Sequence, residues 1–310
     1  MEQSVWVITG PTASGKSALA MNIAMQYHCE IVCMDSMQIY RGMNVGTAKP
    51  TKAEQQAVPH HMLDIVSPRD EYSVSLYQKQ AEDVIQGIFD RGNQPLLVGG
   101  TGFYLRALRN PMALGDTAAD ASFREEMEHV SVLPDGPDKL HTMLEAVDPV
   151  TANRLHKNDV RRVIRALEVY HVTGKPFSAQ RKITGDARYS YRVVALDMDR
   201  NVLYERIHER IARMLEEGLV EEVKGLLAEG VPADAQSMQG IGYKEVIPFI
   251  RGEITRIDME NVIRLNTRHY AKRQLTWMRH EGQVQWVNPL NPDAAEQTIR
   301  CFQSTAHADA

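Results

Sequence analysis

A glycine-rich loop near the start of the chain constrains its fold more than any other feature. The loop follows an apolar run at residues 5–9, precedes a helical pattern at residues 16–27, and matches the spacing G-x-x-x-x-G-K-S. Glycines let such a loop fold so that its backbone N–H groups point at phosphate oxygens, and the N-terminus of the next helix adds partial positive charge. The sequence therefore predicts a phosphate-binding loop formed by Gly10, Pro11, Thr12, Ala13, Ser14, Gly15, Lys16 and Ser17.

The last two residues of this loop have predicted roles. Lys16 supplies a point charge to the terminal phosphate, and the hydroxyl of Ser17 helps to hold Mg²⁺, which is the cofactor we expect. The loop indicates a bound phosphate chain, but it does not specify ATP. A chance glycine turn is the alternative, and the strand before the loop and the helix after it argue against that alternative.

The rest of the chain alternates between two kinds of pattern. Further apolar runs at residues 30–34, 96–98 and 192–196 lie next to helical patterns, which is typical of a parallel sheet with helices on both faces. Between about residues 112 and 191 no strand pattern appears, and apolar residues recur at helical spacing. We therefore predict an α/β fold. A P-loop NTPase-like parallel sheet core, with C-terminal helices, comprises residues 1–112 and 191–310, and a mainly helical insertion domain comprises residues 113–190.

Asp35 directly follows the second apolar run, at the carboxyl end of a predicted strand. Open α/β sheets bind their ligands at this edge. The carboxylate could be a second-sphere ligand of Mg²⁺ or a general base, and it could also cap the segment that follows, since capping and catalysis are compatible. The motifs N-K-x-D and D-x-x-G of a switch GTPase do not occur, whereas a metabolite kinase stays possible on these residues.

Three arginines are spaced by four and three residues in a helical segment at residues 202–217. Arg206, Arg210 and Arg213 therefore share one face of the predicted helix. Stacked guanidinium groups over the phosphate loop would neutralise a leaving phosphate. A solvated face paired with neighbouring glutamates explains the spacing equally well.

The formal net charge of −5 argues at first against a nucleic-acid partner. The charge is unevenly distributed, however, because residues 154–165, 181–192 and 262–280 are strongly basic. Such segments in a net-acidic chain predict a surface for a polyanion. In the third segment Lys272 and Arg273 are candidate contacts, and Tyr270 and Trp277 could stack on bases, although core packing is the better interpretation of each aromatic side chain alone.

The cysteines and the apolar runs bear on where the protein works. Three cysteines without zinc-ligand spacing indicate reduced thiols of a cytosolic protein. No basic segment precedes the first apolar run, and the apolar runs are too short to span a bilayer. We therefore expect a cytoplasmic protein that does not contact a membrane, and we further expect a monomer.

Taken in order, several strings of residues resemble those of the tRNA dimethylallyltransferase (tRNA isopentenyltransferase) family along nearly the whole chain. Each string alone is weak, but the series is specific. The strings are GPTASGKS from Gly10, DSMQIY from Asp35, GTAKP from Gly46, PHHMLD from Pro59, VGGTGFY from Val98, GIGYKE from Gly240 and AKRQLTW from Ala271. Since no C-terminal zinc-finger pattern is present, the chain resembles the shorter bacterial form.

The resemblance implies a specific reaction. A dimethylallyl group passes from dimethylallyl diphosphate to N6 of adenosine-37 of tRNA, just 3′ of the anticodon, and gives N6-dimethylallyladenosine. The phosphate loop would then hold the diphosphate, and the partner would be the anticodon stem-loop of a tRNA. Two alternatives differ in class, namely a small-molecule or nucleotide kinase and a non-catalytic RNA-binding protein with a phosphate loop.

The resemblance also implies roles for individual residues. Asp35 would accept a hydrogen bond from N6, and Thr101 would lie near the reacting centre. Lys16 and Arg210 would stabilise the leaving diphosphate. The positions that match tRNA contacts of the family are Asp35, Ser36, Met37, Gln38, Thr101, Arg124, Asp159, Val160, Arg161, Arg162, Val163, Gly240, Ile241, Gly242, Tyr243, Lys244 and Glu245.

Overall fold

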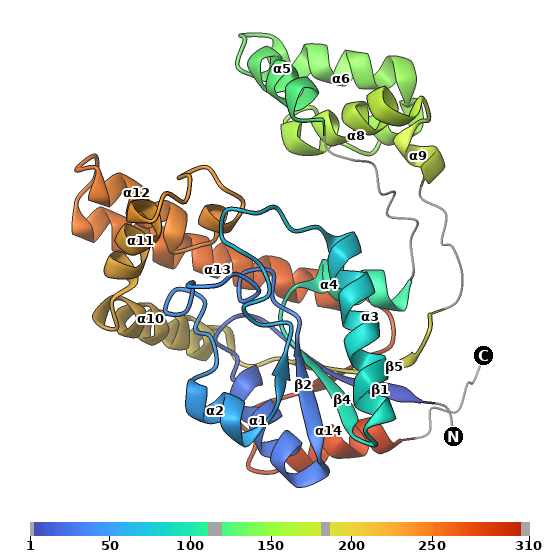
Figure 1. The fold of residues 1–310 in the computed structure, drawn as a ribbon, viewed down its shortest axis with the longest axis vertical. Coiled ribbons are helices and arrows are strands. Elements are labelled where there is room, and N and C mark those ends of the chain that lie inside the picture. Colours follow the sequence, from blue (N-terminus) through green and yellow to red (C-terminus); the bar gives the residue numbers. More distant parts are fainter. Residues whose placement is uncertain (1–2, 111–119, 181–186, 305–310) are drawn as a thin grey trace. The chain divides into compact units, whose positions relative to one another are not determined.

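The chain divides into two compact units in a computed structural model, which describes residues 3–110, 120–180 and 187–304 (Figure 1). One unit is formed by Met1–Arg109 together with Arg188–Ala310, and the other by Asn110–Ala187. The domain boundary predicted between residues 112 and 113 lies outside the described residues. At the other boundary, a strand of the first unit begins at Ser190, next to the predicted return at residue 191.

A six-stranded parallel sheet forms the centre of the first unit. In spatial order its strands are β3 (His60–His61), β2 (Cys29–Cys33), β4 (Gln94–Val98), β1 (Ser4–Thr9), β5 (Ser190–Leu196) and β6 (Val284–Val287). The register places Val7 of β1 opposite Leu97 of β4 and Val193 of β5. The prediction of a parallel α/β core is confirmed. The sequence did not predict β3 and β6, which are short edge strands with little buried apolar surface to reveal them.

Helices cover both faces of this sheet (Figure 1). The helices described in this unit are α1 (Lys16–Tyr27), α2 (Lys52–Ala57), α3 (Val74–Asp90), α4 (Gly102–Arg109), α10 (Arg200–Glu216), α11 (Leu219–Ala228), α12 (Tyr243–Ile250), α13 (Arg256–His280) and α14 (Ala294–Gln303), with the short 3-10 helix η1 (Ser237–Gln239). Side chains alternate along β1, so Val5 and Val7 join the core under α3 and α4, whereas Ile8 joins the core under α1 and α14. The sheet is therefore buried on both faces, as its continuous apolar runs require.

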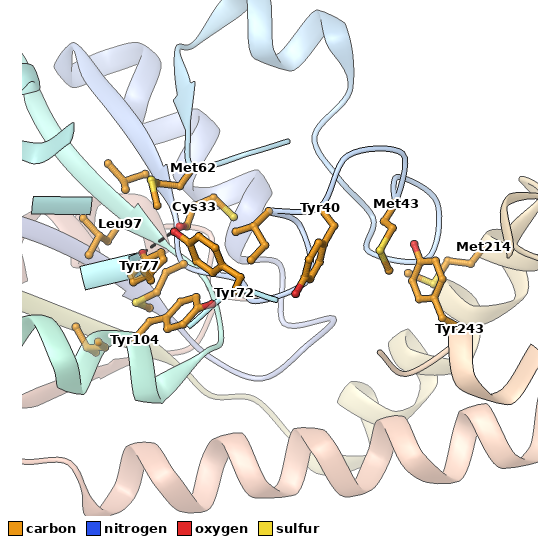
Figure 2. Close-up of a cluster of buried hydrophobic side chains, with 14 of the residues drawn as sticks. Cys33, Tyr40, Met43, Met62, Tyr72, Tyr77, Leu97, Tyr104, Met214 and Tyr243 are labelled. Carbon is orange, nitrogen blue, oxygen red and sulfur yellow. Dashed lines mark hydrogen bonds between the residues drawn. The ribbon is translucent and has the colours of Figure 1, made fainter. Parts of the chain in front are cut away.

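A cluster of buried tyrosines holds the end of β2 in place (Figure 2). The hydroxyl of Tyr77 donates a hydrogen bond to the carbonyl of Cys33 at 3.0 Å, and its ring stacks on Tyr104 with ring centroids 3.7 Å apart. Burial satisfies the apolar rings while the hydroxyl finds a backbone partner. Because Cys33 ends β2, this contact fixes the backbone two residues before Asp35.

The second unit is helical throughout residues 120–180, where the structure describes no strand, in line with the predicted helical insertion. Its helices are α5 (Ala121–Ser131), α6 (Gly136–Val147), α7 (Pro149–Ala152), α8 (Val160–Thr173) and α9 (Phe177–Gln180). Leu140 and Leu144 of α6 pack against Val163 and Leu167 of α8 in a core of its own. Spacings of four residues place these side chains on one face of each helix.

Candidate active site

Loops that follow three adjacent strands meet at one edge of the sheet. The predicted phosphate loop follows β1, Asp35 follows β2, and Thr101 follows β4. Parallel strands end at the same edge, so residues far apart in the sequence converge there. Lys16 and Asp35, together with Arg210 from α10, line one cavity of about 1070 Å³. The structure thus brings together three of the four predicted catalytic side chains around a shared space, and Thr101 lies beside it next to Gly100.

The phosphate loop has the backbone that its glycines predict. Gly15 adopts a left-handed conformation with φ of 90°, and Ala13 adopts φ of 64°. Lys16 begins α1, and its Nζ donates hydrogen bonds to the carbonyl oxygens of Gly10 at 3.0 Å and Pro11 at 2.7 Å. The ammonium group therefore folds back over the loop, at the place where the sequence predicts a phosphate chain.

Burial and, to a smaller extent, the nearby guanidinium of Arg210 lower the pKa of Lys16 to about 7, although the carboxylate of Asp35 opposes both effects. Two cations and one anion thus share a poorly solvated space. Burial also lowers the pKa of Arg210, again against the pull of Asp35. An excess of positive charge in such a space favours a bound anion.

Asp35 plays the capping role that the sequence suggested. Its Oδ1 accepts hydrogen bonds from the backbone N–H of Met37 at 2.8 Å and of Gln38 at 3.4 Å. Within the described part of the chain, Oδ2 makes no hydrogen bond, and the residue lines the cavity. The carboxylate is therefore oriented by its own turn and keeps one oxygen for a ligand.

Thr101 is held against the segment that carries Asp35. Its backbone N–H donates to the carbonyl of Met34 at 3.2 Å, and its Oγ1 accepts from the N–H of Ser36 at 3.1 Å. The approach requires a glycine at Gly99, because a Cβ there would lie 1.9 Å from the carbonyl oxygen of Met34. The loops after β2 and β4 are consequently held against each other by these contacts.

The arginine stripe of α10 faces the phosphate loop. Arg206, Arg210 and Arg213 all line the cavity together with Lys16. Arg210 donates a hydrogen bond from Nη2 to the carbonyl of Thr47 at 3.3 Å, which leaves the rest of its fork toward the cavity. The spacing alone allowed a purely solvated face, and the structure places the stripe at the site instead.

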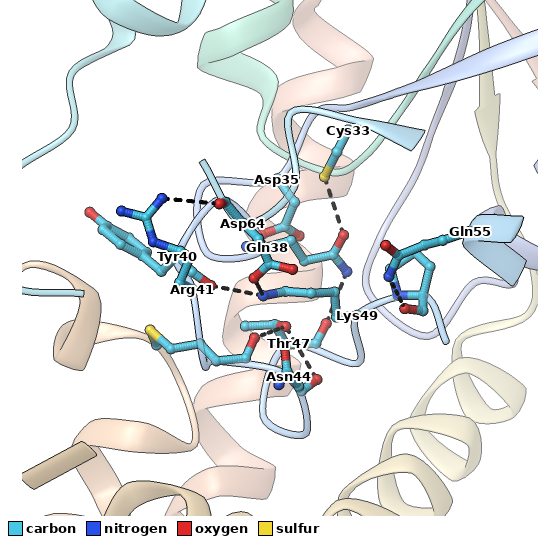
Figure 3. Close-up of polar contacts among 12 residues, drawn as sticks. Cys33, Asp35, Gln38, Tyr40, Arg41, Asn44, Thr47, Lys49, Gln55 and Asp64 are labelled. Atoms are coloured by element: carbon cyan, nitrogen blue, oxygen red, sulfur yellow. Dashed lines mark hydrogen bonds and ion pairs between the residues drawn. The ribbon is translucent and has the colours of Figure 1, made fainter. Parts of the chain in front are cut away.

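A polar network beside Asp35 was not predicted (Figure 3). The buried Nζ of Lys49 pairs with Oδ1 of Asp64 at 2.5 Å and donates to the carbonyl of Tyr40 at 2.8 Å. Gln38 donates from Nε2 to the carbonyl of Thr47 at 3.1 Å. Both members of the ion pair occur in the strings that carry the family resemblance, so their positions in those strings were the available signal.

Gln274 of α13 is a second residue that the sequence reasoning missed. It is 6% exposed, lines the cavity, and bonds to the backbone of the phosphate loop at Thr12 and of the neighbouring loop at Gly100. A polar side chain on the inner face of a basic helix was the signal that could have identified it.

The cavity offers oxygen ligands that fit Mg²⁺. Ser17 and Asp35 both line it. Within residues 3–110, 120–180 and 187–304, no group of three or more histidine, cysteine and acidic side chains could hold a metal ion by itself. Mg²⁺ commonly uses one or two protein oxygens together with substrate phosphates and water, so this sparse set suits an ion that arrives with a diphosphate. The metal itself stays a prediction.

Comparison with protein families decides the relationship. A family model described as IPP transferase matches residues 38–281. The chain belongs to the IPP transferase family. A second model, described as isopentenyl transferase, matches residues 3–67. The resemblance seen in the sequence strings is confirmed.

Individual members of the IPP transferase family align over nearly the full chain. A protein of Pelotomaculum thermopropionicum named tRNA dimethylallyltransferase is 42% identical over 307 residues, which are 97% of each chain. A protein of the same name from Carboxydothermus hydrogenoformans is 44% identical over 290 residues, or 93% of each chain.

Two solved structures resemble this one. A crystal structure of the full-length tRNA isopentenylpyrophosphate transferase of Bacillus halodurans has a TM-score of 0.71 and 40% identity, and the match covers 97% of this chain and 95% of that one. A eukaryotic dimethylallyltransferase, described as acting on tRNA, has a TM-score of 0.77 and 28% identity over 96% of this chain and 78% of that one. The fold is therefore that of the family.

In the first unit, two of the strings typical of the IPP transferase family meet. Met37 packs against Gly240, where a Cβ would lie 2.6 Å from the methionine Cε. Tyr243 is buried and donates to Glu222 at 2.6 Å, and Glu245 accepts from the N–H of Gly242 at 2.7 Å. The side chains of Tyr243 and Glu245 thus serve the fold. Among the tRNA contacts predicted on these two strings, the partly or fully exposed residues are Asp35, Ser36, Met37, Gln38, Ile241 and Lys244.

The basic segment on α13 contains cations in ion pairs as well as cations that are exposed. Arg264 pairs with Glu260 at 3.4 Å, and Arg279 pairs with Asp197 at 3.1 Å. Trp277 packs beneath Gly102, where a Cβ would lie 2.3 Å from its ring, and the tryptophan is only partly buried. The predicted contacts Lys272 and Arg273 are exposed. They line a second hollow of about 490 Å³ together with His269, Thr276 and Trp277.

In the second unit, the predicted contacts likewise differ in exposure. Arg124 pairs through Nε with Oε1 of the fully buried Glu168 at 2.7 Å, so its guanidinium stabilises the helical core. Val163 lies in that core. Arg161 and Arg162 are exposed, and Arg162 pairs with Asp159 at 3.0 Å. Among the basic residues of segment 181–192, Arg181 and Lys182 lie outside the described residues.

The described helices include none that is long and apolar enough to cross a bilayer.

Proposed function

We propose that this member of the IPP transferase family transfers a dimethylallyl group from dimethylallyl diphosphate to N6 of adenosine-37 of tRNA, next to the anticodon. The names of its relatives support tRNA prenylation. The observation that carries the proposal is the shared cavity, in which the phosphate loop with Lys16 and the arginines of α10 face an oriented carboxylate, Asp35. A site of this kind separates an anionic leaving group from a proton acceptor.

Lys16 and Arg210 act on the leaving group. The bond between C1 of the allyl group and the diphosphate oxygen breaks, and its electron pair stays on the diphosphate. The backbone N–H groups of residues 10–17, the ammonium of Lys16 and the guanidinium of Arg210 are placed to stabilise that growing charge. Because these groups are fixed before the substrate binds, little reorganisation accompanies bond cleavage.

Asp35 acts on the nucleophile, N6 of the adenine. The lone pair of the exocyclic amine is delocalised into the adenine ring, so N6 attacks weakly unless it is oriented. Oδ2 of Asp35 accepts a hydrogen bond from N6–H, and the carboxylate takes the proton as the N6–C1 bond forms. Oδ1 stays bonded to the backbone of Met37 and keeps the carboxylate in place. Thr101 braces this segment through its contact with Ser36.

Mg²⁺, held through Ser17 and the diphosphate, would supply further positive charge to the leaving group when bound. Neither Lys16 nor Arg210 depends on the ion for its position, because each is held by backbone carbonyls. The proton transfer to Asp35 is likewise independent of it.

The acceptor must be an unstacked base, since an enzyme that modifies a base inside a cavity cannot reach its target atom within a duplex. A base in the single-stranded loop of an anticodon arm meets this need, and the exposed cations on α13 and α8 would contact its backbone phosphates. We further propose that the enzyme works as a monomer, since all four predicted catalytic residues come from one chain. Its three cysteines without zinc-ligand spacing support a location in the cytoplasm.

One experiment tests the proposal. The protein is incubated with unmodified tRNA and either labelled dimethylallyl diphosphate or ATP labelled in its γ-phosphate. Label from the prenyl donor should enter tRNA and appear in N6-dimethylallyladenosine after nuclease digestion. Phosphate transfer from ATP without prenylation would indicate the kinase alternative, and tRNA binding with no transfer would indicate the non-catalytic alternative.

A further inference from the structure

One face of helix α13 runs along both loops of the site. Tyr270, Gln274 and Met278 are spaced by four residues, so they lie on the same side of the helix. Tyr270 lies beside Thr101 and lines the cavity, and the sulfur of Met278 accepts from the hydroxyl of Thr9 at 3.8 Å. Gln274 lies between these contacts, at the point where the two loops approach each other.

A single carboxamide joins the two loops. Oε1 of Gln274 accepts from the N–H of Thr12 at 2.8 Å, and Nε2 donates to the carbonyl of Gly100 at 2.9 Å. The contact is close, because a Cβ on Gly100 would lie 2.0 Å from Nε2. The loop that holds the leaving group and the loop that carries Thr101 are therefore tied through one buried side chain.

We propose that Gln274 is a positioning residue for prenyl transfer. It sets the separation of the phosphate loop and the Thr101 loop, and hence the alignment of the breaking C–O bond with the attacking N6. This inference rests on the proposed function. A misplacement of about 1 Å in a reacting geometry costs about 100-fold in rate, so loss of the link should reduce turnover more than binding.

The chemistry of the link requires an amide. Asparagine and glutamine present an acceptor and a donor side by side in a group that stays uncharged at every accessible pH. A glutamate at position 274 could still accept a hydrogen bond from the N–H of Thr12. Its second oxygen would face the carbonyl oxygen of Gly100, and because both are acceptors no hydrogen bond could form there. Protonation of that carboxyl group restores a donor. Burial would raise its pKa toward the accessible pH range.

The test uses two variants and a matched control. Gln274→Met removes both hydrogen bonds and keeps the side-chain volume, whereas Gln274→Glu makes the link depend on pH. Gln236→Met is the control, because Gln236 makes the same pair of contacts, accepting from the N–H and donating to the carbonyl of Tyr72 at 2.9 Å each, on a different loop. Single-turnover prenylation, the KM for each substrate and the thermal midpoint are measured for all.

For Gln274→Met we expect a single-turnover rate about 10- to 100-fold below that of the unmodified protein, with the KM for tRNA changed less than about threefold. For Gln274→Glu, the rate relative to the unmodified protein should rise about tenfold from pH 8 to pH 5.5. The control should keep its rate. If Gln274→Met does not fold, the pH profile of Gln274→Glu decides alone.

Two results would overturn the inference. One is a pH-independent ratio for Gln274→Glu, and the other is a loss of rate in Gln236→Met equal to that in Gln274→Met, which would point to general stability. Failure of the proposed function has a different signature, because the unmodified protein itself would then form no prenylated tRNA.

Discussion

Binding of a diphosphate should draw a proton onto Lys16. In the free protein, burial and Arg210 hold the pKa of this lysine at about 7. At pH 8 only about 10% of the free protein then carries the charge, whereas a bound diphosphate restores the ammonium form, so about 0.9 proton is taken up. The uptake falls to about 0.5 proton at pH 7 and about 0.1 at pH 6. Since the charged form binds the anion, affinity should fall about tenfold between pH 6 and pH 8 from this group alone.

Calorimetry with inorganic pyrophosphate measures this uptake. The heat of binding is compared in buffers of different ionisation enthalpy, and the slope reports the protons exchanged. Pyrophosphate titrates as well, so Lys16→Arg is the matched control, because an arginine stays charged and the ligand contribution is common to both proteins. The unmodified protein should take up close to one proton more than the variant at pH 8. Equal uptake by both proteins, with both binding, would refute the reasoning.

Three further outcomes follow from the structure. Asp35→Asn keeps the oxygen that accepts from the backbone, so it should lower the single-turnover rate about 10²- to 10⁴-fold while leaving pyrophosphate affinity within about threefold; a near-normal rate would exclude Asp35 as the base. Binding of tRNA should weaken steeply with salt, and replacing Lys272 and Arg273 together by alanine should reduce the log–log slope by about 1.5 in filter-binding assays; an unchanged slope would remove both from the interface. Glu30 has its pKa lowered to about 2, chiefly by hydrogen bonds from Arg91, so this carboxylate contributes stability above about pH 4.5 that is lost as the pH falls toward 2. Arg91→Ala should therefore unfold at a higher pH in an acid titration followed by circular dichroism, and an unchanged midpoint would contradict this.

Most of the fold could be predicted because its signals are local. The apolar runs of β1, β2, β4 and β5 are bounded by loop residues, and the helix after the phosphate loop begins at Lys16 as predicted. The edge strand β6 could not be predicted in this way. Its four residues include two exposed ones, and only pairing with β5 makes them a strand.

The residues of the candidate site also differ in whether a local sequence signal reveals them. Lys16 and Ser17 belong to a motif whose spacing carries the chemistry, and Asp35 follows a strand that the sequence reveals. The location of Arg210 depends on how α10 crosses the sheet edge, which its helical spacing does not specify. Family resemblance supplied that assignment, and the cavity lining now supports it by geometry.

The basic segment on α13 shows why composition could not separate two functions. Lys272 and Arg273 are exposed, while Gln274 of the same helix contacts both loops of the site and Trp277 packs against Gly102. A helix turns by 100° per residue, so neighbours in the sequence face different directions. Phosphates bound by Lys272 and Arg273 would therefore contact α13, the helix that also holds the two catalytic loops together through Gln274. The whole-chain charge of −5 averages over this surface, whereas the proposed role of Gln274 would link the predicted tRNA contacts on this helix to the chemistry.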